Sequence, residues 1–299
     1  MRNMNLLLIV ISVLLIAGCG DVAPPDVPFL DHGDRYETKP DLARVEHELP
    51  LGPADLAKLT PENVAVLSQE QVDQIYARLT AGPIPDGAFN GTFFFADGGG
   101  AKRLSELMGG IKGLAVRFKL DKLETIGQML WKGKVFYREQ RLLRNMIQDR
   151  QLLKLVVDDP GALPKTDIPG RKILGLIQDD AWLLFPAKLY CGQSLLDSRR
   201  ESVIIDYAFN DEIEGYRERP DFLAGRRGLK IRDEIRMIRP GFYLGRAYMG
   251  HVFLLNFTLY NEQVADSGNA EFMKTGIVAE DCWQGGQQPG RLATLESKG

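Results

Sequence analysis

The strongest constraint on the fold is the alternation of residue types in the second half of the chain. Six segments there carry β-branched, aromatic and other apolar residues at a period of two or in short unbroken runs, which is typical of strands. They are residues 171–178, 181–190, 202–209, 230–238, 241–249 and 252–260. Turn signals such as Asp179-Asp180 and Pro240-Gly241 separate neighbouring segments. This order predicts an antiparallel β-meander, and closure into a barrel would remove its exposed edges.

The first half of the chain adds helices and further strands. Thr60 and Pro61 favour a helix start, and apolar residues recur every three or four positions across 61–80, which predicts an amphipathic helix. Aromatic residues and glycines predict strands at 87–95 and 131–137. Other candidates are helices at 101–109 and 121–130, a segment at 140–155 that suits helix or loop, and a loop at 158–170. We therefore expect a mainly β (α+β) fold, an antiparallel β-barrel or half-barrel with a few packed helices.

Composition narrows the function classes. The chain has 299 residues, of which 44% are hydrophobic and 26% charged, as in folded soluble domains. A formal net charge of −3 gives no basic footprint, so we expect no nucleic-acid partner. Three histidines and three cysteines argue against a zinc site, and the phosphate-binding loop of nucleotide hydrolases is absent from the sequence. We expect no cofactor and no metal, with an all-oxygen calcium site left open.

The N-terminus has the layout of an export signal. Arg2 precedes an apolar run at residues 6–16, which is shorter than the roughly 20 residues that a membrane-spanning helix needs. A basic start followed by a short apolar core is typical of a secretory signal peptide. The run ends in Ile16-Ala17-Gly18-Cys19. An ordinary signal peptide with an incidental cysteine and an uncleaved anchor remain alternatives.

Small residues before a cysteine resemble the lipobox of bacterial lipoproteins, in which the cysteine is acylated and becomes the new N-terminus. The resemblance implies acylation of Cys19 by palmitate-like chains, and Gly20 favours sorting to the outer membrane, facing the periplasm. The membrane would then be a partner through acylated Cys19. The expected organisation is a signal peptide (1–18), an acylated cysteine with a Pro-rich tether (19–60), a barrel-like domain with N-terminal helices (61–264) and a C-terminal tail (265–299).

A second resemblance concerns the order of motifs. Gly87-Ala88-Phe89-Asn90-Gly91 follows the predicted helix, Trp131-Lys132-Gly133-Lys134-Val135-Phe136 comes later, and Val203–Tyr207 precedes a hairpin rich in Gly, Phe and Leu. This order resembles the small GXWXG-motif domains of unknown function, which are β-rich and lipocalin-like, across residues 60–260 in outline. Phe89 stands where the motif has Trp. The resemblance implies a β-barrel that holds a small molecule, such as a lipid or another hydrophobic compound, and implies no reaction.

Strand alternation also yields candidate site residues, because every second side chain shares a face. Five polar side chains fall within largely apolar strands: Asp206, Asp233, Arg246, Tyr248 and Asn256. A few polar groups in an apolar cavity are typical of ligand sites. The same residues would also suit an Asp–Arg pair that closes the barrel, or solvated cross-strand ion pairs. Because an isolated buried charge is costly, we expect Asp206 to be buried and paired with Arg246.

Two other functions stay open at this point. Asp206 and Asp233 could act as acid–base carboxylates of a periplasmic enzyme. The Arg-rich stretch at 217–239 could be an interface in an envelope complex, or surface charge balanced by neighbouring acids. In an oxidising compartment Cys191 and Cys282 could form a disulfide.

Overall fold

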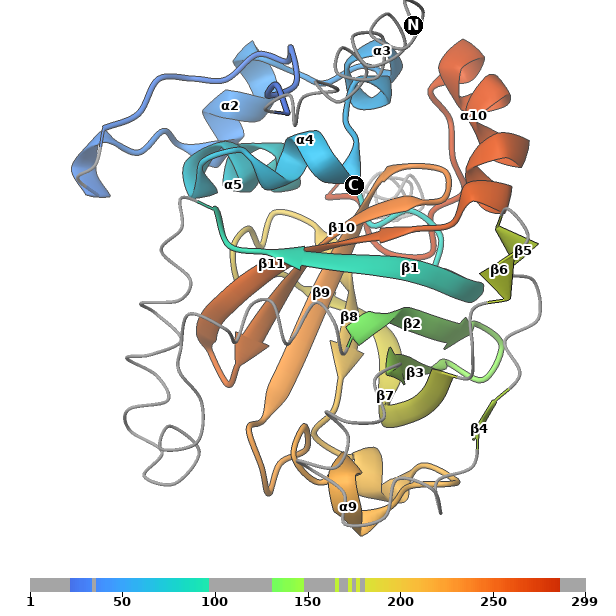
Figure 1. The fold of residues 1–299 in the computed structure, drawn as a ribbon. Coiled ribbons are helices and arrows are strands. Elements are labelled where there is room, and N and C mark those ends of the chain that lie inside the picture. The colour runs from blue at the N-terminus through green and yellow to red at the C-terminus, as the bar shows by residue number, and fades with distance from the viewer. Residues whose placement is uncertain are drawn as a thin grey trace, which may run out of the picture.

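The main sheet of the protein closes into an antiparallel β-barrel (Figure 1). The computed structural model describes residues 22–33, 36–96, 131–147, 165–166, 172–173, 176–177 and 181–285. The strands follow the order β3-β2-β1-β11-β10-β9-β8-β7, and pairing of β3 with β7 closes the ring of eight. Every one of these pairs is antiparallel. The expectation of a mainly β barrel with a few helices is confirmed.

The strands of the second half lie close to their predicted positions. They are β7 (Ala181–Gln193), β8 (Glu201–Asp206), β9 (Ile231–Arg239), β10 (Phe242–Met249) and β11 (Val252–Tyr260). In place of one strand at 171–178, the described residues form a separate hairpin of β5 (Lys172–Ile173) and β6 (Leu176–Ile177).

The first half supplies the rest of the ring. It contributes β1 (Gly87–Phe94), β2 (Trp131–Tyr137) and β3 (Leu142–Ile147), and β4 (Lys165–Thr166) pairs with β7. Part of the ambiguous segment 140–155 is therefore a strand. The helices predicted at 101–109 and 121–130 lie outside the described residues, as does most of the predicted loop at 158–170.

The helix predicted at 61–80 is two helices. These are α4 (Pro61–Ala65) and α5 (Gln69–Ala77), because Ser68 starts a new helix with a capping box. Its side chain accepts a hydrogen bond from the Gln71 amide, and the Gln71 side chain accepts one from the Ser68 amide. The residues between the helices keep the apolar spacing, so the break is invisible to periodicity.

The expected tether is wrong over its described part. The segment contains η1 (Tyr36–Thr38), α2 (Leu42–Glu48) and α3 (Pro53–Ala57). Val27, Val45 and Leu59 are buried against the rest of the protein. Pro53 lies in the segment expected to be a tether, yet it begins α3, because the first turn of a helix needs no backbone donor. Pro61 begins α4 in the same way, as its place after Thr60 predicts. In Figure 1, α2 to α5 gather at one side of the barrel and α9 (Glu218–Asp221) lies at the opposite end.

The barrel wall is buried on both faces along part of its circumference. The inward-facing side chains of the strands fill the lumen; they include Phe89, Phe136, Ile205 and Tyr243. Leu244 and Phe242 on the outer face pack against α4, α5 and the chain that precedes them. Among the described residues, the sheet therefore separates the lumen core from the core under the helices, and a smaller cluster of Ile147, Trp182 and Leu184 lies at β3 and β7.

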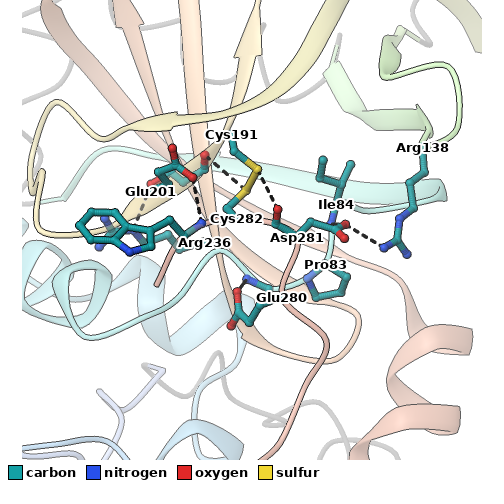
Figure 2. Close-up of a disulfide and its surroundings, with 12 residues drawn as sticks. Pro83, Ile84, Arg138, Cys191, Glu201, Arg236, Glu280, Asp281 and Cys282 are labelled. Carbon is teal, nitrogen blue, oxygen red and sulfur yellow. Dashed lines mark hydrogen bonds and ion pairs between the residues drawn. A yellow bond between two sulfur atoms is a disulfide. The ribbon is translucent and has the colours of Figure 1, made fainter. Parts of the chain in front are cut away.

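The C-terminal segment folds back onto the barrel. After β11 the chain forms α10 (Glu262–Thr275), which ends at Gly276 in the left-handed conformation. The following residues reach β7, where Cys191 and Cys282 form a disulfide (Figure 2). Cys282 belongs to the lumen core. Over residues 265–285, the segment expected to be a tail therefore contains most of α10 and packs on the barrel. No helix in the described ranges is long and apolar enough to span a membrane.

Candidate functional site

A cavity occupies the end of the barrel nearest α9. Its volume is about 350 Å³. Aromatic side chains from β1, β2, β7 and β11 form much of its wall, and aliphatic residues of β9, β10 and the loop after α9 complete it. The described lining residues are Phe93, Trp131, Lys134, Asn145, Ile147, Phe185, Tyr207, Leu223, Ala224, Leu229, Ile231, Asp233, Ala247, Leu255 and Phe257. Such a wall suits an apolar guest.

Four polar side chains meet in this apolar lumen, one from each of four segments. Lys134 of β2 is 3% exposed, and its ammonium donates to Asp233 Oδ2 at 2.9 Å, Tyr207 Oη at 2.7 Å and Asn145 Oδ1 at 2.9 Å. The Asn145 amide group donates to Tyr207 Oη and to the Phe185 carbonyl, both at 3.0 Å. We call Lys134, Asn145, Tyr207 and Asp233 the lumen cluster.

The charges of the lumen cluster are matched within it. Burial by itself lowers the pKa of Lys134, but Asp233 and Tyr207 more than offset this, and the net pKa lies above its ordinary value. Lys134 is therefore a cation at neutral pH, and Asp233 is its counterion. Burial is also the main cause that raises the pKa of Tyr207 to about 12, so its hydroxyl keeps its proton. The ammonium also lies 5.4 Å from the ring centroids of Trp131 and Phe257, a cation–π distance.

Two glycines make room for the aromatic wall. A Cβ on Gly91 would overlap the Trp131 ring, and one on Gly245 would overlap the Phe257 ring. Each ring therefore occupies the space that a side chain on the neighbouring strand would fill. A register irregularity of β2 between Trp131 and Gly133 places Trp131 and Lys134 on the same side of the sheet.

The loop between β8 and β9 covers the end of the cavity and is tied to the barrel by Asp221. The Asp221 carboxylate accepts hydrogen bonds from the Phe185 amide at 2.6 Å and the Arg217 amide at 3.0 Å. Burial raises the pKa of Asp221 even though both amides oppose the shift. This contact holds Leu223 and Ala224 in the cavity wall.

Of the five polar residues predicted to line a site, only Asp233 lies in the cavity. Arg246, Tyr248 and Asn256 lie on the outer face of the barrel, under α5. Arg246 pairs with Asp73, Tyr248 donates to Glu234 at 3.0 Å, and Asn256 donates to Gln69 at 2.8 Å. Arg246 and Asn256 thus fasten the helix to the barrel, while Tyr248 links Arg246 to Glu234 of β9.

The expected pair of Asp206 with Arg246 is wrong. Asp206 is half-buried at the end of β8, where it accepts hydrogen bonds from Tyr190 Oη and the Ala208 amide, each at 2.8 Å. Nor can Asp206 and Asp233 act as paired carboxylates. Ile205 is the register partner of Asp233, so Asp233 shares a face with Ile205 and Asp206 points to the other face.

Three members of the lumen cluster were missed from the sequence. Alternation along the predicted strand at 202–209 puts Tyr207 on one face with Val203 and Ile205, and that face is the lumen. Lys134 and Asn145 gave weaker signals, because a lysine in Trp-Lys-Gly-Lys and an asparagine in an ambiguous segment are ordinary surface residues. A lysine between two aromatic residues of a predicted strand was the available clue.

The other candidate features are structural. In the Arg-rich stretch, Arg226 pairs with Asp211 at 2.9 Å and Arg227 with Glu218 at 2.8 Å. Within the described ranges one group has the spacing of metal ligands, Cys191, Glu201 and Cys282, but the disulfide occupies both sulfurs.

Comparisons with known proteins add little. No protein-family model and no curated protein matches this chain. Among solved structures, the crystal structure of a protein from Thermomonospora curvata aligns with 70% of this chain and 97% of its own, at 17% identity and a TM-score of 0.35. Likeness at that level supports no argument about this chain.

Proposed function

We propose that this protein is an outer-membrane lipoprotein whose barrel binds a hydrophobic or amphipathic small molecule. The observation that carries the binding proposal is the cavity of about 350 Å³ with its apolar wall and single polar cluster. Ligand pockets commonly have volumes of about 300–1,000 Å³, mostly apolar walls and a few placed polar groups. Burial of a guest's apolar surface there contributes about 25 cal/mol per Å².

Filling the cavity tests the binding proposal. Ala247 and Ile231 line it, so Ala247→Phe and Ile231→Trp each place a larger side chain in the space. The matched control is Ala270→Phe, at an exposed position of α10. We expect the wild type and the control to bind the apolar dye N-phenyl-1-naphthylamine with increased fluorescence, and the filled variants to bind at least about tenfold more weakly.

Two further readouts make this test decisive. Thermal melts establish that the filled variants are folded, and native mass spectrometry of protein from its own host looks for a co-purifying ligand. Equal dye binding by the wild type and both folded filled variants would refute the cavity as the site.

The lipoprotein proposal rests on the Ile16-Ala17-Gly18-Cys19 sequence after a short apolar run. Replacing Cys19 with Ser removes the thiol that would be acylated. The variant should then leave the membrane fraction or stay as an unprocessed precursor. A Cys19→Ser protein that is processed and still sediments with membranes would contradict acylation at this residue.

A further inference from the structure

The hydrogen-bonding capacity of the lumen cluster is almost fully used inside the cluster. Lys134 has three N–H groups, and each has an oxygen partner. Asn145 uses both amide hydrogens, and its oxygen accepts from Lys134 and from Trp131 Nε1, the latter at 2.9 Å. Tyr207 accepts from Lys134 and Asn145 and donates to Asp233 at 3.3 Å.

Spare capacity remains on one residue, and it is acceptor capacity. Among the described residues, the side-chain hydrogen bonds to Asp233 come from Lys134 and Tyr207, and both end on Oδ2. A carboxylate offers about four lone-pair positions. A group on a guest can therefore donate to Asp233, at Oδ1, without breaking a bond of the cluster.

The cavity is also electrically balanced. Lys134 and Asp233 are the charged residues among the described lining side chains, and they form one ion pair. A carboxylate or phosphate that entered would find no unused donor on the ammonium and would face Asp233. An ammonium that entered would find the carboxylate already matched by Lys134. Either ion would be buried without a counterion, which costs several kcal/mol.

We propose that the cavity selects apolar molecules whose polar group is an uncharged hydrogen-bond donor, such as an alcohol or a phenol, over fatty acids, phosphates and amines. This inference rests on the proposed binding function and names its ligand class. The donor would approach Asp233, while the aromatic wall holds the apolar body.

The test compares probes with one chain and different head groups. Decanol, decanoate, decylammonium and decyl methyl ether are titrated at neutral pH into the wild-type protein loaded with N-phenyl-1-naphthylamine. We expect decanol to displace the dye with an affinity at least about tenfold greater than that of either ion. The ether, which accepts but cannot donate, should bind more weakly than decanol by a few-fold.

Charge variants give the readout that a merely structural ion pair would not give. Asp233→Asn leaves Lys134 without a counterion, so the affinity for decanoate should rise at least about tenfold relative to the affinity for decanol. Lys134→Met leaves Asp233 unmatched, so decylammonium should gain instead. The double variant Lys134→Met/Asp233→Leu has no charge in the cluster, so it should bind decanol better than either ion but no longer better than the ether, because the acceptor at Asp233 is gone. Thermal melts exclude unfolded variants, and the wild-type comparison stands without them.

The outcomes separate the two proposals. Tighter or equal binding of decanoate or decylammonium by the wild type overturns the inference and leaves small-molecule binding intact. Folded charge variants with unchanged preferences also overturn it. Failure of all four probes to displace the dye overturns the inference, and equal dye binding by the wild type and the folded filled variants overturns the proposed function and the inference with it.

Discussion

At the scale of single residues, the buried ion pair of Arg246 with Asp73 fastens α5 to the barrel. Arg246 is 4% exposed, and its guanidinium lies 4.3 Å from the Phe253 ring centroid. Burial by itself lowers the pKa of Arg246, but the charge of Asp73 and the hydrogen bonds to Tyr248 and Asp73 reverse this and raise it. Strand periodicity predicted that Arg246 is buried, but it could not identify a partner on a helix far away in the sequence.

Removing Asp73 should lower the free energy of unfolding more than removing Asp206, the carboxylate that the sequence pattern paired with Arg246. Asp73→Ala leaves the Arg246 charge buried without a counterion, so we expect a loss of about 3 kcal/mol. Asp206→Ala is the matched control, because Asp206 is half-buried and bonds Tyr190 and its own turn; its loss should stay below about 1 kcal/mol. Denaturant unfolding measures these losses in Asp73→Ala, Asp206→Ala, Arg246→Ala and the Asp73/Arg246 double variant. If the losses of Asp73→Ala and Arg246→Ala add up to that of the double variant, the two side chains do not interact.

Another buried arginine, Arg236, predicts an acid-sensitive contact. Arg236 is fully buried and donates to Asp197 Oδ2 at 3.1 Å. Burial by itself raises the pKa of Asp197, but hydrogen bonds and charges from Arg199 and Arg236 outweigh it and hold the pKa below its ordinary value of 3.8. A carboxyl group whose pKa is lower in the folded state stabilises the fold at pH values above its unfolded-state pKa. This stabilisation is lost as the pH falls from there through the folded-state pKa.

Asp197→Asn should therefore destabilise the protein more at pH 5 than at pH 3. Denaturant unfolding at the two pH values measures the difference in the free energy of unfolding between variant and wild type. This difference should be smaller at pH 3. Asp266→Asn, at an exposed position of α10, is the control and should show no pH-dependent gap. A gap for Asp197→Asn that is constant or widens in acid would contradict the assignment.

At the scale of elements, strands were predictable because local pattern and turn chemistry agree with the final sheet. The Pro240-Gly241 turn joins β9 to β10, with Gly241 at a φ of 75° that favours glycine. The site was harder, because the outer face of β10 is also buried. Leu244 and Arg246 on one face looked as internal as Tyr243 and Ala247 on the other. Alternation sorts residues into faces, but it cannot say which face is the lumen when a helix covers the outside.

Glycines inside strands carry a testable packing requirement. Gly245 of β10 leaves room for the Phe257 ring, which a Cβ would overlap. Gly245→Ala should therefore cost about 1–3 kcal/mol, the range for overpacking, and should weaken dye binding because Phe257 lines the cavity. Gly52→Ala is the control: a Cβ there would meet only Asp55 Oδ2, at an ordinary contact distance of 3.9 Å, so it adds no overpacking and should leave dye binding unchanged. Denaturant unfolding with dye titration checks both, and equal losses would refute the packing argument.

At the scale of the whole molecule, the chain closes on itself twice. The β3–β7 pairing closes the barrel, and the Cys191–Cys282 disulfide returns the C-terminal segment to β7. Noncovalent contacts accompany the disulfide: Asp281 accepts from the Ile84 amide at 2.8 Å and from Arg138 at 2.7 Å (Figure 2). Glu280 accepts from the Gly82 amide at 2.8 Å. The segment thus bridges the helical half, through residues 82–84, and the barrel.

The disulfide should stabilise the whole fold and not only its own surroundings. It joins residues 91 apart, so the chain-entropy model gives roughly 4–5 kcal/mol of destabilisation when it is removed. We expect Cys191→Ala/Cys282→Ala to lower the free energy of unfolding by up to about that amount. We also expect faster hydrogen exchange at the amides of residues 276–285. Wild type treated with dithiothreitol should match the double variant, and the variant itself should not respond to the reductant. A loss below about 1 kcal/mol with unchanged exchange would mean that the contacts of Glu280 and Asp281 hold the segment alone, since those hydrogen bonds survive the substitution.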